Sequence, residues 1–343
     1  MGRQRELDLI AGRPGDRRSF LVECAAVVDE DVEAIERGFR KVERSRPLQK
    51  HMVLVLKGVG DVDLAGAHAL IDEAKFGIIG RLAGAILRPI ERRVLHQSDV
   101  LLADTFTHRE LYVDRFGIAD SAVHVVPVGT DQQAPETVEP VGSVDRRGGG
   151  SALRVLFFGT ALPLHGIEYI IEAVGRCEPG TVQLRMIGGS RDWIHLLCQR
   201  HGVDAQTIEH QTWVPLDQIL AEEIPAADIC LAGPFGDTPQ ATRVITGKTF
   251  EFLALAKPTI VGENIEMKHW GFRDGMNCLT VPLADAASLS NVIMWATQHP
   301  DELAEIGRNG SLLLRDEFGP INNAARIDDA LDEVLGRIRC TAA

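Results

Sequence analysis

The sequence has no apolar run long enough to cross a membrane, and its six cysteines form no C-x-x-C pair. A membrane span needs roughly 18 consecutive apolar residues. The cysteines are scattered, and several lie within apolar runs such as residues 228–232, so we expect buried thiols and neither disulfides nor metal ligands. The first ten residues lack the apolar core and cleavage site of a signal peptide. These absences predict a cytoplasmic protein without a metal site.

Basic residues are also few, with 36 Lys and Arg against 49 Asp and Glu and a formal net charge of -13. Such a charge repels nucleic-acid phosphates, so we expect no nucleic-acid partner. One stretch, residues 76–95, is basic and amphipathic and could lie on anionic lipid at the inner membrane face. We prefer to interpret it as a core helix. Peripheral membrane contact stays open as the alternative.

The chain contains no internal repeat, and its one linker-like stretch is residues 132–151, which include Pro135, Pro140 and Gly148-Gly149-Gly150. A length of 343 residues favours about two domains. We therefore predict an N-terminal domain over residues 1–140, a linker over 141–151 and a C-terminal domain over 152–318. A last segment, 319–343, is predicted to form a helix that packs back on the first domain.

Short apolar runs alternate with helical patterns on both sides of the linker, which is typical of parallel sheets with crossover helices. In the second half we expect strands at 153–158, 182–187, 207–212, 228–232 and 258–261, and helices at 166–177, 191–201, 216–223, 246–256, 286–298, 300–317 and 321–338. In the first half we expect strands at 19–28, 51–56, 100–103 and 123–126, and helices at 29–44 and 107–116. The fold class predicted is α/β, with two Rossmann-like domains.

Glycines follow several of these strands, at the edge where open parallel sheets bind phosphate. The segments concerned are Gly159-Thr160, Gly188-Gly189 and residues 233–248. A nucleoside diphosphate is matched there by backbone N–H groups at helix N-termini and by cations. Lys248 and Glu251 are three residues apart and share a helix face, so an ammonium for phosphate and a carboxylate for ribose can point into one cleft. The alternative is an exposed helical pair worth about 0.3 kcal/mol.

The order of motifs resembles that of the retaining glycosyltransferases of family 4, which have the GT-B fold of two Rossmann-like domains facing across a cleft. No single motif carries the resemblance, but the ordered set extends over roughly residues 95–317. The matching segments are Ser98–Asp104, Val123–Asp131, Val155–Thr160 with His165–Glu168, Trp213–Pro215 and Thr249–Pro258. The first domain is reduced or divergent by comparison, since no glycine-rich loop is visible at its start.

The resemblance implies a donor site for a nucleotide sugar such as a UDP- or GDP-sugar, with no metal and no other cofactor. The residues implied to bind the donor are Gly159, Thr160, Gly188, Gly189, Val214, Thr246 and Glu251. Val214 would lie beside the base, and its neighbour Trp213 is expected to be partly buried. Gly188 and Gly189 could instead serve only a tight turn.

The sequence departs from the family pattern at the charged positions. Thr160 and His165 stand where many members carry Arg and Lys, and Arg243 stands where the first of two paired glutamates is found. We interpret this as a redistribution of charge, in which Arg243 and Lys248 clamp the diphosphate. Together with His165, these are the candidate catalytic residues, although His165 could simply cap the following helix.

The acceptor side is expected in the first domain, where Gly58 and Gly60 form a candidate loop and His68 is a candidate polar contact. The acceptor itself could be a glycan, a lipid-linked sugar or a small molecule. Retaining transfer needs no strong base if the departing phosphate takes the acceptor proton, so activity does not depend on a histidine there.

The function expected is transfer of a sugar from a nucleotide diphosphate to an acceptor hydroxyl with retention of configuration. Two alternatives stay open: a catalytically silent GT-B-like binding or scaffold protein, and a nucleotide-sugar epimerase. A nicotinamide dehydrogenase is disfavoured because no G-x-G-x-x-G follows an early strand.

Overall fold

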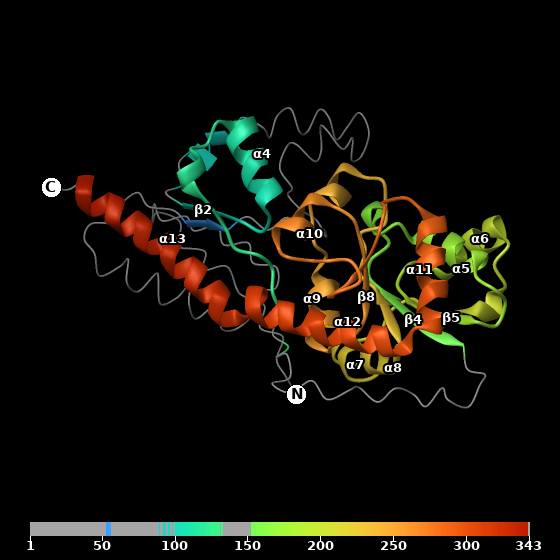
Figure 1. Cartoon of the computed structure of the whole chain (residues 1–343). Coiled ribbons are helices and arrows are strands. Elements are labelled where there is room, and N and C mark those ends of the chain that lie inside the picture. Colours follow the sequence, from blue (N-terminus) through green and yellow to red (C-terminus); the bar gives the residue numbers. More distant parts are fainter. Residues whose placement is uncertain are drawn as a thin grey trace. The chain divides into compact units, whose positions relative to one another are not determined.

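The computed structural model describes residues 53–55, 89, 92–93, 95–96, 98, 100–130, 132 and 152–341 (Figure 1). The chain divides into two compact units, one formed by Met1–Pro127 with Asn323–Ala343 and the other by Val128–Asn322. The segments expected at 19–28 and 29–44, the linker predicted at 141–151 and nearly all of the amphipathic stretch 76–95 lie outside the described residues.

The second unit is built on a six-stranded, all-parallel sheet with the order β6-β5-β4-β7-β8-β9. The strands are β4 (Leu153–Phe158), β5 (Val182–Ile187), β6 (Ile208–Gln211), β7 (Ile229–Leu231), β8 (Thr259–Gly262) and β9 (Leu279–Val281). The five expected strands are confirmed, whereas β9, which has only three residues and a central threonine, was missed. The strand order reverses between β4 and β7, and ligands of open α/β sheets bind outside the carboxyl ends of the strands at such a switch point.

The helices of this unit follow the predicted alternation. They are α5 (Ile167–Arg176), α6 (Arg191–His201), α7 (Leu216–Gln218), α8 (Ile224–Ala226), α9 (Gly247–Ala254), α10 (Ile265–His269), α11 (Ala286–Gln298) and α12 (Pro300–Leu313). A π-helical turn, η5 (Ile219–Glu223), joins α7 to α8, and another, η7 (Leu314–Phe318), follows α12. Short 3-10 turns occupy η3 (Pro163–His165), η4 (Ala205–Thr207) and η6 (Pro239–Thr242). Among these α-helices, α8 and α10 fall where no element was expected.

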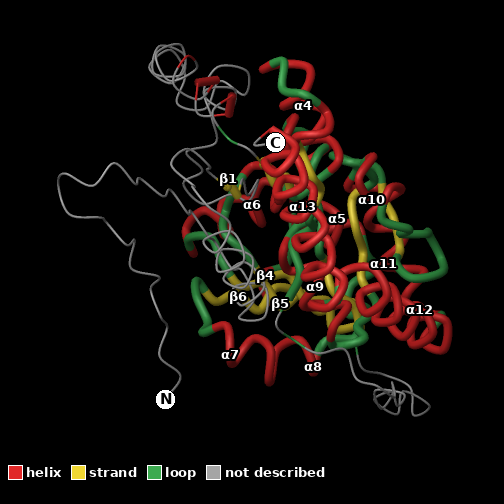
Figure 2. The backbone as a smooth tube through the Cα atoms, turned by 90° about the vertical axis from the view of Figure 1, so that its left-hand side faces the viewer, coloured by secondary structure: helices red, strands yellow, loops and turns green. Residues whose placement is uncertain are grey.

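Helices cover both faces of the sheet, because successive side chains of a strand point to opposite sides. On one face, Leu153, Val155 and Phe157 of β4 belong to a core shared with α5, α6 and α11. On the other, the Phe158 ring packs edge-on against Phe252 of α9, with 5.3 Å between the ring centroids. Figure 2 shows the yellow strands with red helices around them. This unit therefore has the three layers of a doubly wound α/β domain.

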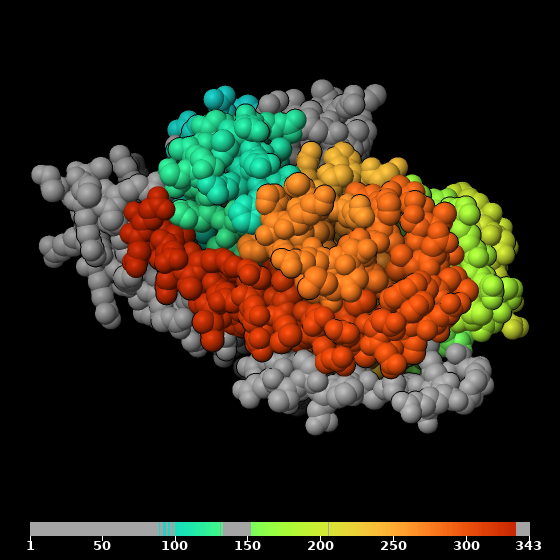
Figure 3. Space-filling model, in the orientation of Figure 1, coloured from blue at the N-terminus to red at the C-terminus, as the bar shows by residue number. Residues whose placement is uncertain are grey.

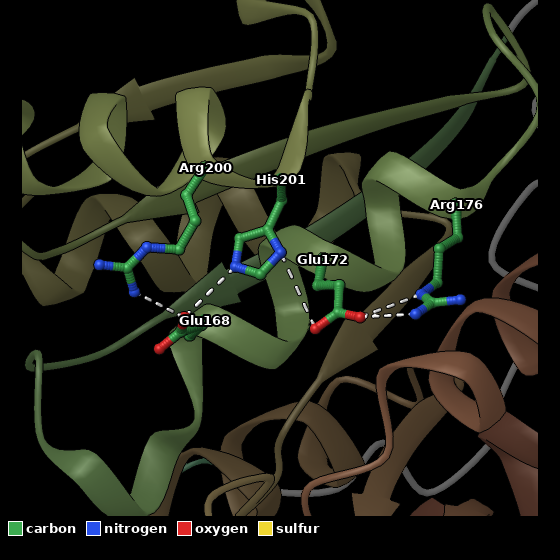
Figure 4. A network of polar contacts seen from close by, with 5 residues as sticks. All are labelled: Glu168, Glu172, Arg176, Arg200 and His201. Atoms are coloured by element: carbon green, nitrogen blue, oxygen red, sulfur yellow. Dashed lines mark hydrogen bonds and ion pairs between the residues drawn. The ribbon is translucent and has the colours of Figure 1, made fainter.

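Charged side chains join α5 to α6 on the surface, as Figure 4 shows. Glu168 of α5 accepts a hydrogen bond from Arg200 at 2.8 Å and lies 3.3 Å from His201. Glu172 lies between His201, at 3.8 Å, and Arg176, at 2.6 Å. The hydrogen bond from Arg200 lowers the pKa of Glu168. Ion pairs near the surface contribute little to the free energy of unfolding. The packing of α5 against α6 is therefore stabilised mainly by the apolar core.

The first unit contains a three-stranded parallel sheet in the order β1-β2-β3, formed by β1 (Val53–Val55), β2 (Val100–Ala103) and β3 (Val123–Val125). Helix α4 (Phe106–Phe116) packs on one face, where Tyr112 and Phe116 share a core with Leu101. A short turn, η1 (Asp120–Ala122), leads into β3. All three described strands and α4 fall where the alternation of apolar runs predicted them.

The last helix, α13 (Pro320–Thr341), supplies the other face of this small sheet from Asn323 onward. Its Ile327, Ala330 and Leu331 are buried in a cluster with Val100 and Leu102 of β2. At its start, the Asn323 side chain donates a hydrogen bond of 3.1 Å to the carbonyl of Pro127. In Figure 3 the red atoms of this helix lie against the teal atoms of the first unit. The sheet is therefore covered on both sides.

Two expectations drawn from composition can be checked in the described part. Cys177, Cys198, Cys230 and Cys278 are free and buried, which confirms the prediction of unpaired thiols for these four. Among the described residues, no helix has the length and apolar character that a membrane crossing requires.

Candidate functional site

The carboxyl end of β4 carries a glycine that two polar side chains approach. Gly159 has a φ of +150°, and a Cβ atom placed on it would lie 3.2 Å from both the Lys248 ammonium nitrogen and the Cε1 atom of His165. Residues with a Cβ rarely adopt this φ, and these contacts are tighter than most Cβ atoms make. The predicted residues Gly159, Lys248 and His165 therefore come together at the switch point of the sheet.

Gly188 lets the end of β5 approach the end of β4. Its N–H donates to the Gln211 carbonyl at 2.9 Å, and the Gly159 N–H donates to the Ile187 carbonyl at 3.0 Å. Gly188 has a φ of +119°, and a Cβ atom placed on it would overlap the carbonyl oxygen of Gly159. Gly189 follows with a φ of +72°. Gly188 therefore does more than form a turn, because it lets the backbone of β5 approach Gly159, whereas Gly189 shows only the positive φ of a turn.

Lys248 is a buried cation in the first turn of α9. Its side chain is 7% exposed, and the ammonium nitrogen lies 4.4 Å from the centroid of the Phe157 ring. Burial lowers its pKa to about 7. No hydrogen bond or ion pair to this nitrogen occurs among the described residues. The exposed pair with Glu251 considered as an alternative is therefore wrong, and the ammonium is available to an anion.

His165 is held by the backbone of the loop that precedes it. Its Nδ1 lies 2.6 Å from the carbonyl oxygen of Thr160, and its ring meets Phe157 edge-on at 5.9 Å between centroids. Burial, together with the nearby charge of Lys248, lowers the pKa of His165 to about 3. Helix α5 has Gly166 as its N-cap and no side-chain cap. The idea that His165 caps this helix is therefore wrong, and the imidazole is neutral in the site.

Two loops pack into one wall beside these residues. The Gly236 N–H donates to the Leu164 carbonyl at 2.9 Å, and a Cβ on Gly236 would overlap the carbonyl of Pro163. A Cβ on Gly166 would meet the backbone of Phe235 at 2.5 Å. The loop segments 159–166 and 235–239 are thus in direct contact. Glycine at both positions is explained by this close approach.

Glu251 lies one turn further along α9 and is bonded to Thr130. The Thr130 hydroxyl donates to the Glu251 carboxylate at 2.8 Å, and this threonine is 5% exposed. Sequence reasoning did not find this partner, although Thr130 belongs to the motif Val123–Asp131. The contact joins residues 121 apart in the chain. It fixes one oxygen of the carboxylate that we predicted for ribose.

Thr246 precedes α9, and its hydroxyl donates to the Ala232 carbonyl at 2.9 Å. The hydroxyl proton is therefore used within the protein. No side chain caps this helix; the Thr249 N–H donates to the Thr246 carbonyl at 2.9 Å, and the N–H groups of Gly247 and Lys248 stand at the open end of the helix. These groups add partial positive charge to the end of α9 that carries Lys248.

The other predicted residues lie around this centre or outside the described part. Arg243 follows η6 and is half-buried; no hydrogen bond or ion pair to its guanidinium occurs among the described residues. Val214 is buried, whereas Trp213 is 71% exposed, so the expectation of a partly buried tryptophan is wrong. Trp213 follows the end of β6. Gly58, Gly60 and His68 lie outside the described residues.

The first unit contains a buried pair that sequence reasoning missed. The Asp104 carboxylate lies 2.6 Å from Nδ1 of His108, and both side chains are buried. Asp104 follows β2, and Thr105 caps α4 by accepting a hydrogen bond from the His108 N–H. The spacing of four residues at a strand-to-helix junction was the signal available in the sequence. Over the described part of the chain, no group of three His, Cys, Asp or Glu residues is arranged to hold a metal ion.

Comparison with known proteins shows the fold to which these features belong. No family model matches the chain, and no curated protein matches it. Among solved structures, it is similar to Anabaena HepE in complex with UDP and glucose, with a TM-score of 0.60 and 14% identity over 87% of this chain and 75% of that one. It is also similar to sucrose-phosphate synthase from Thermosynechococcus elongatus, with a TM-score of 0.59 and 18% identity over 89% of this chain and 72% of that one. These neighbours are glycosyltransferases of GT-B type, so the chain has a fold of two Rossmann-like α/β domains.

Proposed function

We propose that this protein is a retaining glycosyltransferase that binds a nucleotide diphosphate sugar at the switch point of the six-stranded sheet and transfers the sugar to an acceptor hydroxyl. The observation that carries the proposal is the Lys248 ammonium, which is buried at the start of α9 and has no anionic partner among the described residues. A buried charge without a partner is unfavourable, so a fold that keeps one is suited to receiving the opposite charge. The resemblance to family 4 supports the same interpretation.

The proposed chemistry follows from the position of this charge. When the bond between the anomeric carbon and the phosphate oxygen breaks, negative charge grows on the departing diphosphate. The protonated Lys248 and the first N–H groups of α9 would stabilise that charge, as fixed donors do where water is excluded. The departing phosphate would take the proton of the acceptor hydroxyl, so the reaction requires neither a metal ion nor a separate base.

The remaining predicted residues would recognise the nucleotide. Glu251, oriented by Thr130, would accept hydrogen bonds from ribose hydroxyls. Arg243 would supply a second cation to the diphosphate, and Gly188, Gly189 and Val214 would border the base. A uridine nucleotide is the first choice, because the HepE structures hold UDP and UDP-glucose. For the acceptor, Gly58, Gly60 and His68 stay sequence predictions.

Nucleotide binding tests the proposal directly. We expect calorimetric titration with UDP, UDP-glucose and GDP-mannose to show binding by at least one of them. Glu251→Gln keeps an oxygen that can accept from Thr130 but loses the charge, so it should weaken nucleotide binding by about 1–3 kcal/mol. Glu172→Gln, on the surface pair with Arg176, is the matched control and should leave binding unchanged.

Turnover separates transfer from its alternatives. A transferase should release UDP from UDP-glucose slowly in water and faster with an acceptor hydroxyl. Interconversion of the donor without release of UDP would indicate an epimerase, and tight binding without any turnover would indicate a silent binding protein. If no nucleotide bound even at millimolar concentration, the proposed site would be refuted.

A further inference from the structure

We infer that His165 is a specificity residue of the proposed donor site, in which its Nε2 atom accepts a hydrogen bond from a hydroxyl group of the transferred sugar. The inference rests on the proposed function. Many related sequences carry a lysine at this position, which suggests a cation that binds phosphate. His165 would instead be a neutral hydrogen-bond acceptor for the sugar.

The tautomer of His165 follows from its partner. A carbonyl oxygen can only accept a hydrogen bond, so the contact of 2.6 Å between Nδ1 and the Thr160 oxygen requires the proton to be on Nδ1. A neutral imidazole carries a single N–H. Nε2 is therefore left with a lone pair and acts as an acceptor.

The surroundings of the ring keep it neutral. The ring and the Lys248 ammonium approach the same face of Gly159, and both lie against Phe157. Protonation would place a second cation beside Lys248 in a buried setting. This is consistent with the low pKa of His165, about 3, which arises from burial first and from Lys248 second. One cation and one neutral acceptor thus lie side by side.

Nε2 has no partner among the described residues, and His165 is partly exposed. Near neutral pH the oxygens of a diphosphate are mainly acceptors, so they would repel the Nε2 lone pair. A hydroxyl group can donate to it. The pair Lys248 and His165 therefore matches a ligand in which an anion and a hydroxyl are neighbours, as they are in a sugar attached to a diphosphate.

The loop that carries His165 is fixed by its packing. The Leu164 carbonyl accepts from Gly236, and Gly166 closes against Phe235. These contacts hold the backbone on both sides of His165, so the acceptor atom is in place before a ligand arrives. Such preorganisation is what a discriminating contact requires.

Two substitutions separate ligand recognition from loop anchoring. His165→Asn places an amide N–H near the position of Nδ1 and can still donate to the Thr160 carbonyl, but it lacks an acceptor at Nε2. His165→Gln places an amide oxygen near the position of Nε2 but loses the Nδ1 donor. The two variants therefore test the two functions of the ring one at a time.

The experiment uses the UDP- or GDP-sugar that the wild-type protein binds best. The quantity to measure is the dissociation constant of the free nucleotide, UDP or GDP, divided by that of the corresponding nucleotide sugar. We expect His165→Asn to weaken binding of the sugar nucleotide by about three- to tenfold, the usual range for one lost hydrogen bond, and to leave the nucleotide unchanged. His165→Gln should keep the ratio of the wild type. The reverse order, with Gln impaired and Asn unaffected, would show a purely structural anchor and overturn the inference.

Nitrogen NMR of histidine-labelled protein gives a reading that needs no ligand. The His165 ring should show the Nδ1–H tautomer throughout pH 5–8. A ring that titrates in this window, or that carries its proton on Nε2, would overturn the inference. Absence of binding by every nucleotide would refute the proposed function and the inference together, whereas nucleotide binding with an unaltered ratio in His165→Asn would refute the inference alone.

Discussion

The ammonium group of Lys248 lies over the ring of Phe157, 4.4 Å from its centroid, although the two residues belong to different elements 91 positions apart in the chain. A contact of this kind contributes about 0.5–2 kcal/mol, whereas burial of an ion without a counter-charge costs several kcal/mol. The ring therefore offsets only part of the cost. The charged Lys248 therefore lowers the free energy of unfolding of the protein when no ligand is bound.

Replacing Lys248 with methionine should stabilise the fold while removing nucleotide binding. Methionine fills a similar volume without an ion, so the free energy of unfolding should rise by about 1–4 kcal/mol near pH 7. Below pH 7 the wild-type lysine is charged in both the folded and the unfolded state. Between pH 7 and about 10.5 the unfolded chain binds the extra proton, so wild-type stability rises with pH across that window and the advantage of the variant shrinks. Urea denaturation at pH 6.5 and pH 9 measures both effects.

The control for this variant is Lys257→Met, at a second buried lysine. The Lys257 ammonium donates to the carbonyls of Pro225 and Ala227 at 2.7 and 2.9 Å. Its removal leaves two acceptors without their donor, so stability should fall by about 1–3 kcal/mol. Equal destabilisation by both substitutions would show that Lys248 is a structural residue and contradict the proposed site.

Nucleotide binding should take up a proton at pH 8. With a pKa of about 7, Lys248 is mostly neutral in the free protein at this pH, and a bound diphosphate favours its charged form. The affinity for UDP should therefore fall by up to about tenfold per pH unit above pH 8. His165, which faces the same space, stays neutral and contributes nothing to this slope. Titration calorimetry in Tris and in HEPES counts the protons taken up.

The matched variant for proton uptake is Lys248→Arg. Arginine stays protonated at every pH of the experiment, so residual binding by this variant should show no uptake from position 248. A wild-type protein that binds UDP with the same enthalpy in both buffers, after correction for the nucleotide, would contradict the assignment of Lys248 to the phosphate.

A methyl group on Gly188 should disrupt the edge of the sheet. The added Cβ would overlap the Gly159 carbonyl oxygen, and the φ of +119° disfavours any side chain. We expect Gly188→Ala to destabilise the protein by about 2–4 kcal/mol and to abolish nucleotide binding. Gly247→Ala is the control, since a Cβ there meets nothing within 4 Å in the first turn of α9. That variant should be neutral or slightly more stable, as thermal unfolding would show.

Helix α13 should stabilise the first unit through a narrow stripe of residues. Ile327 is 3% exposed and packs with Val100 and Leu102, whereas Ile321 in the same helix is 83% exposed. Ile327→Ala should lower stability by about 2–5 kcal/mol, and Ile321→Ala by less than about 0.5 kcal/mol. Chemical denaturation followed by the ellipticity of the chain measures both. A similar loss in the two variants would be incompatible with the packing of this helix.

Most of the fold could be predicted from the sequence, because the signals are local. The apolar runs at Leu153–Phe158 and Val182–Ile187 mark strands by their composition, and the helix over 191–201 shows its start in Ser190 and its end in Gly202. The short β9 escaped because three residues with a polar centre carry no periodicity. Trp213 was misjudged because an aromatic residue near a strand end has no local sign of its exposure.

The site divides in the same way. The alternation of strands and helices predicts a parallel sheet, in which the carboxyl ends of all strands lie at one edge. The sequence therefore places Gly159, Gly188 and the start of α9 at that edge. The sequence by itself determined the alternation, the edge and the residue types gathered there. Only the tertiary structure decided that Lys248 is buried over Phe157, that Thr160 holds His165 as an acceptor, and that Thr130 bonds to Glu251. These are contacts between elements far apart in the chain, and charge, tautomer and burial depend on what surrounds a group, which the spacing of residues does not record.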